Sequence, residues 1–307
     1  MPLDLSGGET ATIMPQTSLP DKWGAVTIVG VGLIGGSVGK ALCQRQLAER
    51  VIGVGRQQEE LELAQQQGVI HEWTCSLAQG VSRADLVVVC VPVDQIAPCI
   101  SEAAKHMPLG SLITDVGSTK RNIISALEGK LPRHVEYVPG HPLAGSEKSG
   151  ARHAQADLFH QRRVILTPTA QNTPRGLARA RAFWTALGAE VLEMSAEEHD
   201  RMAAAISHLP HVLAASLVLA TPAQWLVFAA SGFRDTTRVA AGDAQLWAAI
   251  LQANCDAVQQ SLHEWERELL RFRRLLETGD GRGLREWLAQ AQQVRHALGS
   301  GNPSDRT

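Results

Sequence analysis

The segment Val26–Gly39, VTIVGVGLIGGSVG, decides the fold of the N-terminal half of the chain. A run of apolar, strand-forming residues leads into the GxGxxG pattern Gly30-Val-Gly32-Leu-Ile-Gly35, and a helical stretch follows it. Such a pattern is weak when it stands alone, but its place between a strand and a helix is typical of a dinucleotide-binding turn. The sequence therefore predicts a Rossmann-type domain.

Each position of this turn has a physical role in such a site. Gly30 permits the tight turn, Gly32 lets the backbone approach a pyrophosphate, and Gly35 lets helix and strand pack closely. The phosphates would lie at the positive end of the helix dipole, beside Leu33 and Ile34. We expect these five residues to bind a cofactor; the alternative is a glycine-rich turn without a ligand.

The end of the second predicted strand selects the dinucleotide. NAD-preferring sites place Asp or Glu there for the ribose 2′-hydroxyl, whereas this chain has Gly55 followed by Arg56. A guanidinium can bind a 2′-phosphate through two hydrogen bonds, so the sequence favours NADP over NAD. A solvated surface arginine is the alternative. Val91 and Pro92, at the end of a later apolar strand, are expected beside the cofactor ribose and nicotinamide.

Short apolar runs alternate with helical stretches as far as about residue 193. Several runs are apolar along their whole length, which is typical of a doubly wound parallel sheet covered on both faces. Strands are expected at Ala25–Val29, Val51–Val54, Leu86–Val91, Ser111–Asp115, Glu136–Pro139, Arg163–Leu166 and Ala189–Leu192. Helices are expected at Ile34–Gln46, Glu59–Gln67, Gln95–His106, Lys120–Leu131 and Pro174–Leu187.

The pattern changes near residue 195, after which helical spacing dominates. The expected organisation is a loose leader (1–22), a Rossmann-type α/β domain (23–195), an all-α domain (196–298) and a loose tail (299–307). Because the helical part is apolar for its length, we expect a homodimer through this C-terminal domain. Its helices are expected at Ala196–Leu219, Trp225–Ala230, Ala244–Thr278 and Gly283–Leu298.

Composition and charge argue against several classes of protein. The formal net charge of −2 provides no basic field for nucleic acid or an anionic membrane. Five cysteines without CxxC spacing indicate reduced thiols in a cytoplasmic protein, and residues 1–21 lack the features of a signal peptide. The uncharged stretch Val212–Phe233 is long enough to span a bilayer, but Thr221–Pro222 predicts two buried helices there instead.

Two motifs of the N-terminal half place polar side chains at the sheet edge where ligands bind. The motif DVGSTK over 115–120 ends a strand and begins a helix, so Ser118 can offer a hydroxyl or cap the helix. His141 follows a strand that ends at Pro139–Gly140. A neutral imidazole can take a proton from an alcohol near neutral pH. Oxidation of a carbinol by hydride transfer requires such a base, so His141 is the expected catalytic residue.

Two further motifs lie in the helical domain. The stretch 207–211, SHLPH, places two histidines three residues apart on one helical face. The stretch 232–247, GFRDTTRVAAGDAQLW, carries arginines that suit a carboxylate. A histidine pair with carboxylates can also bind a metal, but hydride transfer to a nicotinamide needs none and no HExxH pattern is present, so no metal is expected. A structural role for both histidines is a further alternative.

Together, GVGLIGGS, DVGSTK, HPLAGSEKSG, SHLPH and GFRDTTRVAAGDAQLW resemble the prephenate/arogenate dehydrogenase family of tyrosine biosynthesis. The motifs occur in the family's order, from about residue 24 to 280. The resemblance implies a dimeric NAD(P)-dependent oxidoreductase in which His141 receives the proton of the ring 4-hydroxyl and Ser118 supports it. It also implies a set of substrate-binding residues, which are Arg238 for a carboxylate, His211, Ser207 and Trp247 in the pocket, and Asp235 and Glu147 near its entrance.

The resemblance leaves the substrate open between prephenate and arogenate. Arg56 resembles the strand ending of NADP-using arogenate enzymes, whereas the SEKSG stretch, with Glu147 and Lys148, is closer to prephenate enzymes; we favour prephenate dehydrogenase. A β-hydroxyacid dehydrogenase or imine reductase would share the Rossmann half but lack HPLAGS and GFRDTTR. A non-catalytic NADP-sensing protein would need neither His141 nor Arg238.

Overall fold

The computed structural model describes residues 22–145 and 150–298. The chain divides between His199 and Asp200 into two compact units. Residues 1–21 of the expected leader, the expected tail 299–307, and Glu147 and Lys148 lie outside the described residues.

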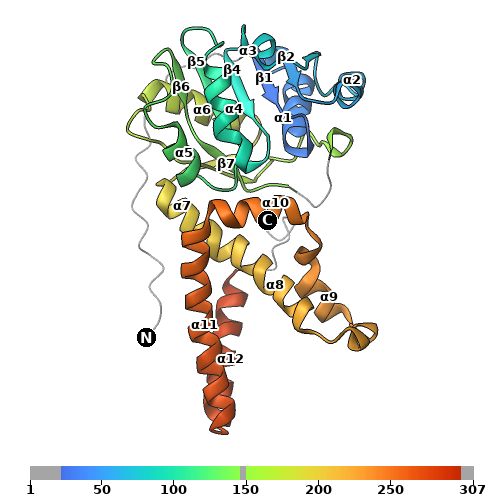
Figure 1. The fold of residues 1–307 in the computed structure, drawn as a ribbon, viewed down its shortest axis with the longest axis vertical. Coiled ribbons are helices and arrows are strands. Elements are labelled where there is room, and N and C mark those ends of the chain that lie inside the picture. The colour runs from blue at the N-terminus through green and yellow to red at the C-terminus, as the bar shows by residue number, and fades with distance from the viewer. Residues whose placement is uncertain (1–21, 146–149, 299–307) are drawn as a thin grey trace. The chain divides into compact units, whose positions relative to one another are not determined.

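A six-stranded parallel sheet forms the centre of the N-terminal unit (Figure 1). Its strand order, β3-β2-β1-β4-β5-β6, is that of a Rossmann fold, in which ligands bind at the carboxyl ends of the strands where the order reverses. All four residues of β4 are buried, as expected of a strand covered on both faces. The Rossmann-type prediction is confirmed. The strands are β1 (Trp23–Val29), β2 (Ala48–Val54), β3 (Glu72–Thr74), β4 (Leu86–Val89), β5 (Ser111–Asp115) and β6 (Val135–Tyr137).

Helices connect the strands of this unit, and local capping fixes where some of them begin. The Ser76 side chain accepts a hydrogen bond from Gln79 N at the start of α3, and Thr173 caps α6 in the same way, ahead of Pro174. Both α3 and β3 were missing from the sequence prediction. The helices are α1 (Leu33–Gln44), α2 (Gln58–Gln66), α3 (Leu77–Val81), α4 (Val93–Ala104), α5 (Arg121–Leu127) and α6 (Pro174–Ala186), with a short 3₁₀ helix, η1 (Ala151–His153).

A second, three-stranded sheet lies in the same unit. Strand β7 (Gly140–Pro142) pairs antiparallel with β8 (Arg163–Leu166), and β8 pairs parallel with β9 (Glu190–Glu193). The sequence predicted strands at the positions of β8 and β9 but gave no sign that they form a separate sheet. The chain leaves the main parallel sheet after Val138, whose N–H still bonds to Ile113 O, and β7 then pairs with β8 instead.

The described part of the C-terminal unit contains only helices, as expected for an all-α domain (Figure 1). A π turn, η2 (Ala204–His208), joins α7 (Ala196–Ala203) to α8 (Leu209–Ala220) at the point where Pro210 provides no N–H donor. The remaining elements are the 3₁₀ helices η3 (Ala223–Phe228) and η4 (Arg238–Ala241) and the α-helices α9 (Ser231–Thr237), α10 (Ala244–Ala253), α11 (Cys255–Glu277) and α12 (Gly281–Ala297).

Two expected helices of this unit differ from the structure. The expected helix Ala244–Thr278 is divided at Asn254, whose side chain donates to Asp200 O at 2.8 Å and contacts His208 Nδ1 at 3.1 Å. The expected α-helix Trp225–Ala230 is the 3₁₀ helix η3. In both places a contact or a tight turn overrides helical propensity.

Large apolar side chains are exposed around the end of α8. The predicted break at Thr221–Pro222 is confirmed, but the predicted burial is wrong, because Leu219 is 86% exposed and Phe228 is 80% exposed. The helical stretch Ala196–Ala220 is, by length and composition alone, the one helix among the described residues that could cross a membrane. An exposed apolar surface of this kind is typical of a site that contacts a partner.

Candidate active site

The glycine turn between β1 and α1 has the geometry of a phosphate-binding turn. Gly30 has φ +94°, and a Cβ on it would lie 2.5 Å from Cys90 O; a Cβ on Gly35 would collide with Gly30 O. Gly32 differs, because a Cβ there would meet no described atom within 4 Å. Gly32 is also the N-cap residue of α1, and no described side chain caps that helix. Such an uncapped helix start has N–H groups without helical partners, which suit an anion.

The other residues expected to bind a cofactor lie near the carboxyl ends of β1, β2 and β4. Leu33 and Ile34 form the first turn of α1 and are half-buried. Val91 Cγ1 lies 3.2 Å from the Cβ position of Gly30, and Pro92 is the N-cap residue of α4. Arg56 is exposed two residues after the end of β2. The strands thus bring these residues to one edge of the sheet.

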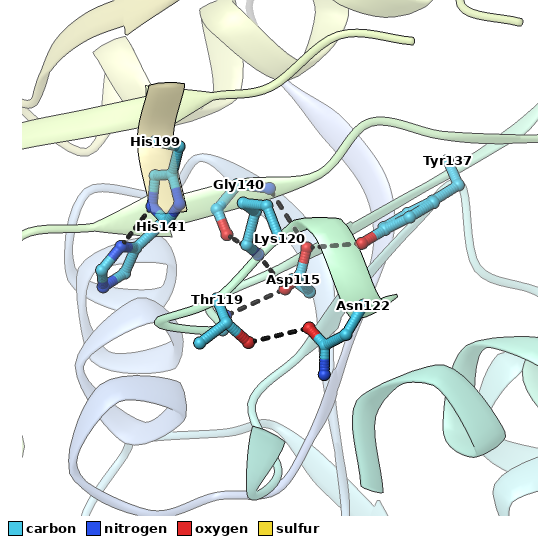
Figure 2. Close-up of polar contacts among 9 residues, drawn as sticks. Asp115, Thr119, Lys120, Asn122, Tyr137, Gly140, His141 and His199 are labelled. Atoms are coloured by element: carbon cyan, nitrogen blue, oxygen red, sulfur yellow. Dashed lines mark hydrogen bonds and ion pairs between the residues drawn. The ribbon is translucent and has the colours of Figure 1, made fainter. Parts of the chain in front are cut away.

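His141 was expected after the end of a strand. In the structure it is the middle residue of the short strand β7. Its Nδ1 atom lies 2.8 Å from Nε2 of His199 (Figure 2), and the two rings meet edge to face, with centroids 5.0 Å apart. His141 is half-buried, whereas His199, on α7, is fully buried. Sequence reasoning missed His199, because it belongs to none of the quoted motifs.

A buried charged network lies next to the backbone before His141 (Figure 2). Lys120 donates to the Asp115 carboxylate and, at 2.7 Å, to Gly140 O. Asp115 Oδ1 also accepts from Tyr137 Oη at 2.9 Å and from Gly140 N at 3.1 Å, and Oδ2 accepts from Gly117 N at 2.9 Å. Burial and the nearby carboxylate raise the pKa of Tyr137 well above its usual value, so its hydroxyl remains a neutral donor.

This network fixes the backbone on both sides of the site. Asp115, the last residue of β5, and Lys120, on the loop after β5, both bond to the backbone of Gly140. Gly140 is the residue directly before His141. Ser118 lies half-buried on the loop after β5. Ser118 does not have the alternative role of capping the following helix, since Lys120 occupies the N-cap position of α5 and makes no side-chain cap. Neither the partners of Asp115 nor the burial of Lys120 was predicted.

In the C-terminal unit, two of the expected pocket residues are in contact. The rings of His211 and Trp247 stack with centroids 3.7 Å apart and an interplanar angle of 14°. Gly242 packs against this stack, since a Cβ on it would lie 2.6 Å from Trp247 Nε1. His208, 6.3 Å from the Trp247 ring by centroid, is buried beside it. The two histidines of SHLPH therefore gather at one tryptophan.

His211 carries an unusual polar atom. Its Nδ1 is buried and has no hydrogen-bond partner among the described residues. Burial lowers the pKa of His211 below its ordinary value, so the ring is neutral at pH 7. A buried nitrogen without a partner costs free energy, and a ligand that supplied one would remove that cost.

The other expected substrate residues of this unit are exposed. Arg238 is exposed at the start of η4, which packs against α8, and Asp235 is exposed on α9. Ser207 is exposed on the π turn. Among the described residues, no group of three or more His, Cys, Asp or Glu side chains could hold a metal ion.

A Rossmann unit with a phosphate-binding turn and a pair of histidines in contact, followed by a helical unit, defines a nicotinamide-dependent dehydrogenase of the two-domain class. Residues 38–193 match the family model "Prephenate dehydrogenase, nucleotide-binding domain", and residues 195–290 match "Prephenate dehydrogenase, dimerization domain". The chain belongs to the prephenate dehydrogenase family.

Individual relatives agree with this assignment. Prephenate dehydrogenase of Bacillus subtilis is 36% identical over 281 residues, which cover 89% of this chain and 76% of that protein. The structure of prephenate dehydrogenase from Aquifex aeolicus, in complex with hydroxyphenyl propionate and NAD+, superposes with a TM-score of 0.84 at 29% identity, over 92% of this chain and 100% of that one. Arogenate dehydrogenase of Synechocystis gives a TM-score of 0.76 at 28% identity, over 89% and 99%.

Proposed function

We propose that this protein is a cytoplasmic prephenate dehydrogenase of tyrosine biosynthesis, which converts prephenate to 4-hydroxyphenylpyruvate and carbon dioxide. The observation that carries the proposal is the position of His141. The residue before it, Gly140, is bonded to Asp115 at the carboxyl end of β5, the edge at which a Rossmann sheet binds ligands, and its ring contacts the buried His199. The family and the relatives support the substrate class.

The proposed chemistry assigns the main step to His141. His141 takes the proton of the 4-hydroxyl as hydride leaves C4, which gives a ketone at C4. When carbon dioxide leaves, the electrons of the broken C1–carboxyl bond enter the ring and make it aromatic, and the oxygen on C4 takes up a proton. The nicotinamide, when bound, supplies the hydride acceptor. Ser118, on the loop held by Asp115, would bond the same hydroxyl. The protein's main task is then to hold C4 in place and remove one proton.

The residues of the glycine turn fit a dinucleotide. Gly32 faces open space at the start of α1, so its backbone can approach a pyrophosphate, while Leu33 and Ile34 flank it. We propose NADP as the favoured cofactor. The support is that Gly55 replaces the acid expected for NAD and that the exposed Arg56 can bind a 2′-phosphate.

The stack of His211 and Trp247 suits the substrate ring and its side chain. The unpartnered Nδ1 of His211 can hydrogen-bond a polar group of the substrate, and Arg238 can bind a carboxylate in a bidentate manner. Ser207 would line the same pocket, with Asp235 near its entrance. No metal has a part in this chemistry.

The exposed apolar residues of α8 and η3 support a homodimer. They lie within the part of the chain that matches a dimerization domain. We therefore assign the exposed Leu219, Trp225 and Phe228 to a contact between two copies and not to a membrane span or a nucleic-acid site.

Arogenate dehydrogenase is the second candidate, favoured by Arg56 and by the similarity to the Synechocystis enzyme. Product analysis separates the two. Prephenate with NADP should give 4-hydroxyphenylpyruvate in amounts equal to the NADPH formed. If only arogenate reacts, and gives tyrosine, the second candidate replaces the first.

A further inference from the structure

Nδ1 of His141 and Nε2 of His199 lie so close that only one proton can lie between them. We propose that His199 is a positioning residue that fixes His141 in the tautomer whose Nε2 carries the lone pair. The inference rests on the proposed role of His141 as the base. It assigns a function to a buried histidine that lies outside the quoted motifs.

The distance decides that a hydrogen bond is present. At 2.8 Å, Nδ1 of His141 and Nε2 of His199 must share a proton, with one ring donating and the other accepting. If His199 donated, neutral His141 would carry its own proton on Nε2 and could not act as a base there. If His141 donates from Nδ1, its Nε2 is the basic atom. Catalysis through Nε2 therefore requires His199 Nε2 to be an acceptor.

The fold holds the two rings in this relationship. His141 lies on β7, and the small sheet continues through β8 to β9, which leads directly into α7 and His199. The backbone N–H of His199 bonds to Ser195 O at 2.9 Å, and Ser195 Oγ accepts from Glu198 N at 3.1 Å. These bonds fix the first turn of α7. A fully buried side chain on a fixed helical turn cannot rotate away at low cost.

The same contact stabilises the charge that forms during the reaction. When His141 Nε2 takes the substrate proton, its ring becomes an imidazolium, and the bond from Nδ1 to His199 becomes charge-assisted. Hydrogen bonds to charged groups are roughly twice as strong as neutral ones. Removing the acceptor should therefore lower the rate of turnover more than it changes the binding of substrate.

The test compares His199→Leu, which removes the acceptor, with His199→Gln, which can present an amide oxygen instead. His106→Leu, at an exposed histidine two residues after the end of α4, is the matched control. We expect kcat to fall about 10- to 100-fold in His199→Leu, the size of one hydrogen bond to a charged group. KM should stay within about twofold, and His199→Gln should recover part of the loss.

The direct readout is the ¹⁵N spectrum of the histidine rings in the folded protein, which distinguishes protonated from unprotonated ring nitrogens. His141 should carry its proton on Nδ1 in the native chain and lose this preference in His199→Leu. A proton on Nε2 of His141 in the native chain would overturn the inference, as would full activity of His199→Leu. If His141→Asn were itself fully active, the proposed base would fail instead, so the two failures are distinguishable.

Discussion

Lys120 Nζ donates a 2.7 Å hydrogen bond to the carbonyl of Gly140, the residue directly before His141. The same ammonium pairs with the Asp115 carboxylate, and both side chains are fully buried. A buried ion pair is a poor source of stability in itself, but removal of one partner leaves an uncompensated charge. The pair therefore affects the stability of the N-terminal unit and also fixes the backbone next to His141, the expected base.

Lys120→Met should destabilise the protein by about 3–5 kcal/mol, because it leaves the Asp115 carboxylate buried without a cation. Tyr137→Phe, which removes one hydrogen bond to that carboxylate, should cost less, about 1.5–3 kcal/mol. Denaturant unfolding of the two variants measures the difference. Lys130→Met, at an exposed position, is the control and should lie within about 0.5 kcal/mol of the native chain. A Lys120→Met variant as stable as this control would refute the role of the pair.

His141→Asn should lower kcat by roughly 10²–10⁴-fold, the usual contribution of a general base. The far-UV circular dichroism spectrum and the affinity for NADP should remain those of the native protein, since Asn also places a polar group at this position. Steady-state kinetics with prephenate measure the effect. A kcat equal to the native value would remove His141 from the mechanism.

Arg238→Ala should act mainly on binding. Loss of a guanidinium that binds a carboxylate should raise KM for prephenate by about 10- to 100-fold, with a smaller change in kcat. Arg282→Ala, an exposed arginine on α12, is the matched control and should leave KM unchanged. If KM stays normal in Arg238→Ala, another residue anchors the substrate carboxylate.

Arg56→Ala should change the choice of cofactor. We expect KM for NADP to rise about 10- to 100-fold, because the bidentate, charge-assisted hydrogen bonds to the 2′-phosphate are lost. KM for NAD, which has no such phosphate, should change by less than about twofold. Equal changes for both dinucleotides would show that Arg56 does not read the 2′-phosphate.

The main features of the fold could be predicted from local sequence. The glycine turn and the fully apolar strand β4 determine a Rossmann sheet, and the change of pattern after residue 193 indicates a helical region. Strands β3 and β7, with three residues each, are too short to show periodicity. The division between α10 and α11 depends on contacts of Asn254 with Asp200 and His208, which local propensity does not contain.

The candidate site could be predicted in part. His141 stood out because a polar residue follows glycine and proline after an apolar strand. His199 did not, since its partner lies 58 residues away in sequence and only the small sheet brings the two together. The pairing of Lys120 with Asp115 was missed. Both residues lie in the motif DVGSTK, from which only a role for the Ser118 hydroxyl was predicted. The burial of a lysine is set by the surrounding structure.

The most direct test of the proposed function is the absorbance at 340 nm when purified protein is mixed with prephenate or arogenate and with NADP or NAD. We expect the fastest rise with prephenate and NADP, together with formation of 4-hydroxyphenylpyruvate. No rise in any of the four mixtures, from protein that still binds NADP, would contradict the assignment as a dehydrogenase of cyclohexadienyl substrates.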